Sequence, residues 1–269
     1  MFKTGQLLLL LETYRIPCNR LVLPVKSEIL TTFATADGVK PVMLKKYIKG
    51  HVVKDLDEIM LSQLGRQVAL LNQIPSPSYL TTNHPYGRQF FPKVISMGID
   101  VKYESWLAEE IDYLDRYIPD NLPRGLIHGD LFYDNMLFDP SSNIPGGFKA
   151  IIDFEEACHY YLVFELGMCI LGTCVNNSVV DFKKARSLVD GYQKVRLLVQ
   201  KEKNSLQVFI RYAAAATSYW RFKKYNIEDP DEDKESHHWK MVQISKKFSE
   251  ISKSHFYDAI FSSEQNISG

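Results

Sequence analysis

Two short segments constrain the fold of this chain more than any other part of it. Residues 126–137 read LIHGDLFYDNML, and residues 150–154 read AIIDF. The first contains the pattern H-x-D-x-x-x-x-N, and the second is an apolar run that ends in an aspartate. Together they supply four side chains that can bind protons or metal ions: His128, Asp130, Asn135 and Asp153.

The residues between these segments predict a β-hairpin. Residues 136–138 are a short apolar run, and residues 148–154 form a second one. The sequences DPSSN and PGG lie between them, and such residues favour turns over regular structure. Because Asn135 precedes the first strand and Asp153 follows the return strand, we expect both side chains at the same end of the hairpin.

The residue types at this spacing are typical of a phosphoryl-transfer site. Such a site positions its reactants and neutralises charge rather than forming a covalent protein intermediate. We expect Asp130 to be the base that accepts the proton of the attacking hydroxyl, and His128 to keep its loop in shape. Magnesium prefers hard oxygen ligands, so we expect Asn135 and Asp153 to bind Mg²⁺ on the nucleotide phosphates.

Composition limits the classes of partner. The chain has 269 residues, no formal net charge and an isoelectric point near 7, so nucleic acid is not an expected main partner. Its four cysteines show no metal-binding spacing, which favours a reduced, cytoplasmic protein. The apolar stretch 160–180 is interrupted by Glu165 and two asparagines, so we expect a buried helix and no membrane association. We expect small-molecule ligands.

Periodicity and breakers predict the remaining elements. We expect strands at 21–25, 29–34 and 41–48, with a turn at 36–38, and a helix to Asn72 capped by Asp55 or Asp57. The other expected helices share apolar residues at helical spacing: 6–14, 102–117, 161–174, 180–192, 201–224 and 237–261.

The motif LIHGDLFYDNMLFD with IIDFEEAC resembles the aminoglycoside-phosphotransferase and choline-kinase superfamily, whose fold is protein-kinase-like. The run D-F-E in place of D-F-G points toward small-molecule kinases and away from protein kinases. Within the superfamily, the type II homoserine kinases are the most similar group, through residues 41–50, 158–174, 191–196 and 208–220. The resemblance implies an α+β bilobal fold, with an incomplete β-rich N lobe and hinge at residues 1–50 and a mainly helical C lobe at 51–269.

The resemblance also implies an activity, namely MgATP-dependent phosphorylation of L-homoserine. Backbone groups of Lys46, Tyr47 and Ile48 would face the adenine. The substrate carboxylate needs a cation and its ammonium group an acid, and the candidates are Arg88 or Arg211 for the first and Glu155 or Glu156 for the second. Structural ion pairs are an equally good interpretation of these charges. Hydroxylysine, choline and aminoglycosides are alternative acceptors.

One departure from the family concerns the N lobe. Relatives carry a phosphate-covering loop and a lysine held by a helix glutamate. Here Lys3 is the only lysine upstream of the corresponding helix, and Gly5 or Gln6 stands where the glutamate is expected. We therefore expect a fragment, a mis-started reading frame or a degraded relative, with weak ATP affinity and impaired kcat. A kinase-like binding or scaffold protein is the alternative function.

Overall fold

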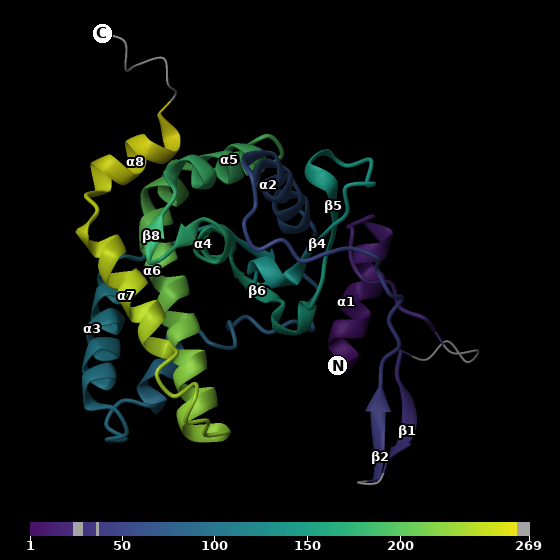
Figure 1. Ribbon diagram of the computed structural model, residues 1–269, viewed down its shortest axis with the longest axis horizontal. Coiled ribbons are helices and arrows are strands. Elements are labelled where there is room, and N and C mark those ends of the chain that lie inside the picture. The colour runs from purple at the N-terminus through teal and green to yellow at the C-terminus, as the bar shows by residue number, and fades with distance from the viewer. Residues whose placement is uncertain (24–28, 36–37, 263–269) are drawn as a thin grey trace.

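The computed structural model describes residues 1–23, 29–35 and 38–262. Helices make up most of it, and all four of its described strand pairs are two-stranded and antiparallel. Figure 1 shows a helical body and, beside it, a smaller part formed by the first helix and first hairpin. This composition agrees with the expected α+β class. The division of domains at residue 50 stays a prediction.

The smaller part contains α1 (Phe2–Thr13), β1 (Thr31–Thr35) and β2 (Gly38–Val42). The β1–β2 hairpin is exposed along almost all of its length and extends away from the body (Figure 1). The expected strand 41–48 is wrong in its bounds, because β2 ends at Val42. Parts of the expected strand 21–25 and turn 36–38 lie outside the described residues.

Backbone hydrogen bonds tie the segments around the hinge to the central hairpin. That hairpin consists of β4 (Met136–Phe138) and β5 (Phe148–Ile151). His51 exchanges two hydrogen bonds with Phe138, at 2.7 and 2.9 Å, and the Ile151 amide donates to Pro17 at 2.9 Å. The predicted hairpin is confirmed, although its return strand is shorter than expected and a short helical turn follows it.

A second strand pair sets the position of the loop at residues 128–135. It joins β3 (Arg124–Ile127) to β6 (Cys158–Tyr161), with Ile127 opposite Cys158. The loop therefore leaves β3 at the same level at which the chain enters β6. The last pair, β7 (Val175–Asn176) with β8 (Val179–Val180), is a tight hairpin after the central helix.

The helices were predicted well, with one exception. Of the two proposed caps, Asp57 is the one used, since its carboxylate accepts from the Met60 amide at 2.8 Å. The expectation of one continuous helix over 237–261 is wrong. The first helix ends before Ile251, and Ser252 caps a second one. The described helices are α2 (Glu58–Asn72), α3 (Val101–Tyr117), α4 (Leu162–Thr173), α5 (Phe182–Gln193), α6 (Gln200–Lys223), α7 (His238–Glu250) and α8 (Lys253–Phe261).

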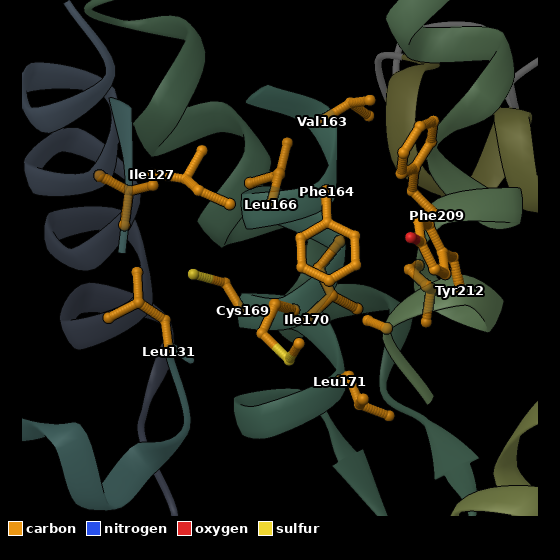
Figure 2. Close-up of a cluster of buried hydrophobic side chains, with 14 of the residues drawn as sticks. Ile127, Leu131, Val163, Phe164, Leu166, Cys169, Ile170, Leu171, Phe209 and Tyr212 are labelled. Atoms are coloured by element: carbon orange, nitrogen blue, oxygen red, sulfur yellow. The ribbon is translucent and has the colours of Figure 1, made fainter. Parts of the chain in front are cut away.

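The core is centred on α4, which is buried on nearly every side. Phe164 of α4 packs against Tyr212 of α6, with ring centroids 5.0 Å apart (Figure 2). Gly167 lets the two helices approach closely, because a Cβ there would lie 2.8 Å from the Phe209 backbone. Helix α4 is buried in protein, and no described helix has the length and apolar character needed to cross a bilayer.

Candidate active site

His128 shapes the loop that follows β3. Its side chain is buried, its Nδ1 accepts from the Asp130 amide at 3.2 Å, and its Nε2 bonds the Ile152 carbonyl at 2.8 Å. Burial lowers the pKa of His128 to about 4, so the ring is neutral and Nε2 is the donor. These contacts agree with the expected role of holding the loop, and they give His128 no path to a substrate.

Glu165 supports the same loop from the first turn of α4. Its buried carboxylate accepts from the His128 amide at 2.7 Å and from the Gly129 amide at 3.0 Å. Burial raises the pKa of Glu165 to about 7. Gly129 has a φ of 88°, and a Cβ there would lie 2.9 Å from the Glu156 carbonyl. The sequence offered one signal for this role, an acid on an otherwise apolar helix.

Asp130 and Asn135 lie side by side at the end of the loop. The Asn135 amide nitrogen donates to the Asp130 carbonyl at 2.7 Å and to its carboxylate at 3.2 Å. The Asn135 amide oxygen is therefore turned away from Asp130 and remains able to bind a cation. Burial, followed by the charges of Asp134 and Glu156, raises the pKa of Asp130 to about 6.

Asp153 follows β5 in a left-handed conformation, with φ 66° and ψ 65°. This conformation costs a residue with a side chain about 1–2 kcal/mol, and such strain is concentrated at functional sites. The Ile152 amide bonds the Asn135 carbonyl at 3.0 Å, which holds the two ends of the hairpin together. A hydrogen bond to Glu155, followed by burial, raises the pKa of Asp153 to about 7.

These groups fit a magnesium ion shared with a nucleotide. Carboxylate and amide oxygens are its preferred ligands. Burial raises the pKa of Asp130 and the neighbouring Glu155 raises that of Asp153, and a bound cation would favour the ionised form of both. In the described part of the chain, no three His, Cys, Asp or Glu side chains are arranged to hold a metal by themselves. Mg²⁺ usually takes one or two carboxylates from a protein and completes its shell with phosphates and water.

A pocket of about 270 Å³ brings the predicted residues together. Asp130, Asn135 and Asp153 line it, and Tyr86 and Phe132 contribute aromatic surface. The last turns of α6 also line it, through Thr217, Trp220 and Arg221. Arg221 is not among the residues predicted from the sequence, and it lies 91 positions after Asp130 along the chain.

The residues proposed to bind an acceptor are placed differently from one another. Arg88 pairs with Asp115 at 2.5 Å and Arg211 with Glu110 at 2.7 Å, and neither lines the pocket. Glu156 accepts a hydrogen bond from Tyr86, which does line it. Glu155 pairs with Lys45 at 2.9 Å. The structure thus brings only the acidic candidates near the catalytic groups.

At the hinge, the backbone of Lys46 is already engaged. Its amide donates to the Arg20 carbonyl at 2.7 Å, and its carbonyl accepts from the Asn19 side chain at 3.5 Å. Tyr47 is 84% exposed and Ile48 follows it. The predicted adenine contact therefore rests on Tyr47 and Ile48, and it stays a prediction.

The chain is similar in sequence to proteins of known name. Residues 5–198 match the model of the phosphotransferase enzyme family. The homoserine kinase of Rhodopseudomonas palustris (strain BisB5) is 36% identical over 110 residues, which make up 40% of this chain and 32% of that protein. The homoserine kinase of Gluconacetobacter diazotrophicus is 25% identical over 227 residues, which make up 80% of this chain and 67% of that protein. The chain thus spans about a third to two thirds of the length of the curated relatives it matches.

Solved structures confirm the fold. A microcompartment-associated aminopropanol kinase has a TM-score of 0.70 at 17% identity, over 96% of this chain and 83% of that one. The amicoumacin kinase hAmiN, in complex with AMP-PNP, Ca²⁺ and Ami, has a TM-score of 0.67 at 13% identity, over 93% of this chain and 81% of that one. The protein-kinase-like fold expected from the sequence is therefore confirmed.

Proposed function

Because the chain belongs to the phosphotransferase enzyme family, we propose that it transfers the γ-phosphoryl group of ATP to a small-molecule hydroxyl, and that this molecule is L-homoserine. One observation carries the proposal: the side chains of Asp130, Asn135 and Asp153 line one pocket from three separate positions in the chain. A structural role explains any one of these side chains. It does not explain an amide oxygen and two carboxylates with raised pKa values at a single pocket.

Each residue has a defined part in the reaction. Asp130 orients the acceptor hydroxyl and receives its proton while the acceptor oxygen forms a bond to the γ-phosphorus. The bond from that phosphorus to the β–γ bridging oxygen breaks, and ADP leaves. Asn135 and Asp153 would hold Mg²⁺, which when bound neutralises charge on the phosphates. With a pKa of about 6, the Asp130 carboxyl is ionised at neutral pH and remains a useful base.

The choice of L-homoserine rests on the names of the curated relatives and on the likeness of the hinge and C-terminal helices. The test is phosphate transfer by the chain, with MgATP, to a panel of L-homoserine, hydroxylysine, choline and kanamycin. Product formation is followed by mass spectrometry. We expect L-homoserine to give the highest kcat/KM. Faster turnover of choline or kanamycin would overturn the substrate and leave the phosphotransferase proposal standing.

A matched pair of variants tests the catalytic base. Asp130→Asn should lower kcat by about 10²- to 10⁴-fold, the usual size of general-base effects. Asp112→Asn, at an exposed position on α3, makes the same chemical change away from the pocket and should leave kcat unaltered. Wild-type turnover by Asp130→Asn would contradict the assignment. Nucleotide binding without turnover of any acceptor would favour a kinase-like binding protein.

A further inference from the structure

Arg221 is a cation placed at the pocket without a carboxylate partner of its own. It lies near the end of α6, half-buried, and its Nη1 donates to the His237 carbonyl at 3.2 Å. Within the described residues, no ion pair joins it to an acid. Three other partly buried arginines differ in this respect, because each has a carboxylate within reach: Arg88 with Asp115, Arg196 with Glu202 and Arg211 with Glu110.

Arg221 also lies where two cavities meet. It lines the pocket of about 270 Å³ and, together with Phe132, a neighbouring polar cavity of about 720 Å³. Lys54, Lys184 and Lys240 contribute further positive charge to the larger cavity, where Asp55 and Asp181 are the acids. Basic side chains thus outnumber acidic ones in the larger cavity, whereas Asp134 joins Asp130 and Asp153 in the smaller pocket, where Arg221 is the one cation among the described lining residues.

The position of Arg221 assigns it to the acceptor and not to the nucleotide. Figure 1 shows α6 and α7 on one side of the β4–β5 hairpin and α1 with the first hairpin on the other. Lys45 follows the first hairpin in the chain and pairs with Glu155, close to Asp153. An acceptor bound between Asp130 and α6 would thus have Arg221 on the face away from the hinge.

The same pocket also has a surface that suits a positively charged group. Tyr86 and Trp220 both line it, with ring centroids 6.0 Å apart, and the Tyr86 hydroxyl donates a hydrogen bond to the Glu156 carboxylate. Aromatic faces beside an acid attract an ammonium group. The pocket thus holds a guanidinium as well as an aromatic and acidic surface, and this combination suits a molecule that carries both charges.

We propose that Arg221 binds the carboxylate of an α-amino-acid acceptor and thereby selects an amino acid over an amino alcohol. This inference rests on the proposed function and names the residue that determines its specificity. Its chemical basis is the planar fork of N–H donors, which matches two carboxylate oxygens, and the partial burial that strengthens such a pair. A choline- or ethanolamine-like acceptor has no carboxylate and would gain nothing from Arg221.

The decisive experiment compares L-homoserine with 3-aminopropan-1-ol, which is the same molecule without its carboxylate. For the full chain and for Arg221→Gln, kcat and KM are measured with both compounds. We expect the ratio of the two kcat/KM values to fall by about 10- to 100-fold in Arg221→Gln, mainly through a higher KM for L-homoserine. Arg221→Lys keeps the positive charge at this position, so its ratio of kcat/KM values should lie between those of Arg221→Gln and the wild type. Arg116→Gln, exposed on α3, is the matched control and should not change it.

Binding without turnover gives an independent readout. Calorimetry of the full chain with each compound should show tighter binding of L-homoserine, and Arg221→Gln should remove that difference. If the wild type phosphorylates L-homoserine and the variant keeps the ratio, this inference is overturned and the proposed function stands. If Arg221→Gln raises the KM for ATP and not the KM for L-homoserine, Arg221 contacts the phosphates, and this inference is also overturned. If the wild type binds neither compound, the inference and the choice of substrate both fail.

Discussion

Replacing Arg211 by methionine should separate a structural arginine from a substrate-binding one. Its guanidinium lies 2.7 Å from Glu110, over the ring of Tyr113 at 3.5 Å from the centroid. The two charged side chains are only 12% and 5% exposed. Ser245 donates to the same Glu110 oxygen at 3.2 Å. Among the described residues, Arg211→Met therefore leaves the buried Glu110 carboxylate with one hydrogen-bond donor, the Ser245 hydroxyl.

Breaking a buried ion pair on one side costs about 3–5 kcal/mol. Glu110 Oε2 and Arg211 Nε lack hydrogen-bond partners, so the pair is imperfect and we expect the lower end, about 3 kcal/mol. In a chain of this size each kcal/mol lowers the Tm by about 2–4 °C, which gives a fall of about 6–12 °C. Thermal unfolding followed by circular dichroism measures it, with exposed Arg116→Met as control.

The sign of the pH dependence follows from the pKa of Glu110, which burial raises even with Arg211 present. Removing Arg211 raises this pKa further. A group whose pKa is raised on folding contributes stability at low pH that is lost as pH rises through the folded-state pKa. The deficit of Arg211→Met relative to the wild type should therefore grow as the pH rises above 4.5, the ordinary pKa of a glutamate.

A double variant completes the test. Glu110→Leu together with Arg211→Met removes both charges, and it should regain most of the lost stability. The KM for the acceptor should be unaltered in every variant that folds, because Arg211 does not line the pocket. A Tm within 2 °C of the wild type for Arg211→Met, or a raised acceptor KM, would refute this reasoning and restore Arg211 as a substrate contact.

Two further predictions concern the catalytic groups. Asp153→Ala should abolish the magnesium dependence of nucleotide binding, since it removes one of the two expected protein ligands. Calorimetry of ATP binding with and without Mg²⁺ measures this dependence. If it is unchanged, Asp153 is only a residue at the end of a strand. The rate should rise with pH through about 6 and then level off, because only ionised Asp130 accepts a proton and its pKa is raised to about 6, mainly by burial. A rate independent of pH between 5 and 7 would contradict this role.

Local sequence was sufficient where local forces decide the structure. Asp57 could be named as one of two caps because its side chain bonds an amide only three residues ahead. The hairpin followed from its turn residues and two apolar runs. The break at Ile251 was missed because Ser252 is a weak signal in a sequence that otherwise keeps helical spacing. The hydrogen bond that the Ser252 hydroxyl accepts from the His255 amide forms only if a new helix begins at this point.

The acceptor side of the pocket could not be predicted, because long-range packing creates it. Arg88 and Arg221 are equally charged in the sequence, and neither has a local motif. Asp115, the partner of Arg88, lies on α3 and becomes a neighbour only when that helix packs. Arg221 comes to share a pocket with Asp130 only when α6 packs on α4, which Gly167 allows. No spacing rule within α6 distinguishes the residue that faces the pocket.

Helix α6 joins the interior of the protein to one wall of the pocket, which bears on the entropy of binding. The same helix that buries Tyr212 against Phe164 presents Trp220 and Arg221 two to three turns later. Side chains on a packed helix have few rotamers left to lose. When a ligand binds to these side chains, they therefore lose little conformational entropy, and a larger part of the contact energy contributes to affinity.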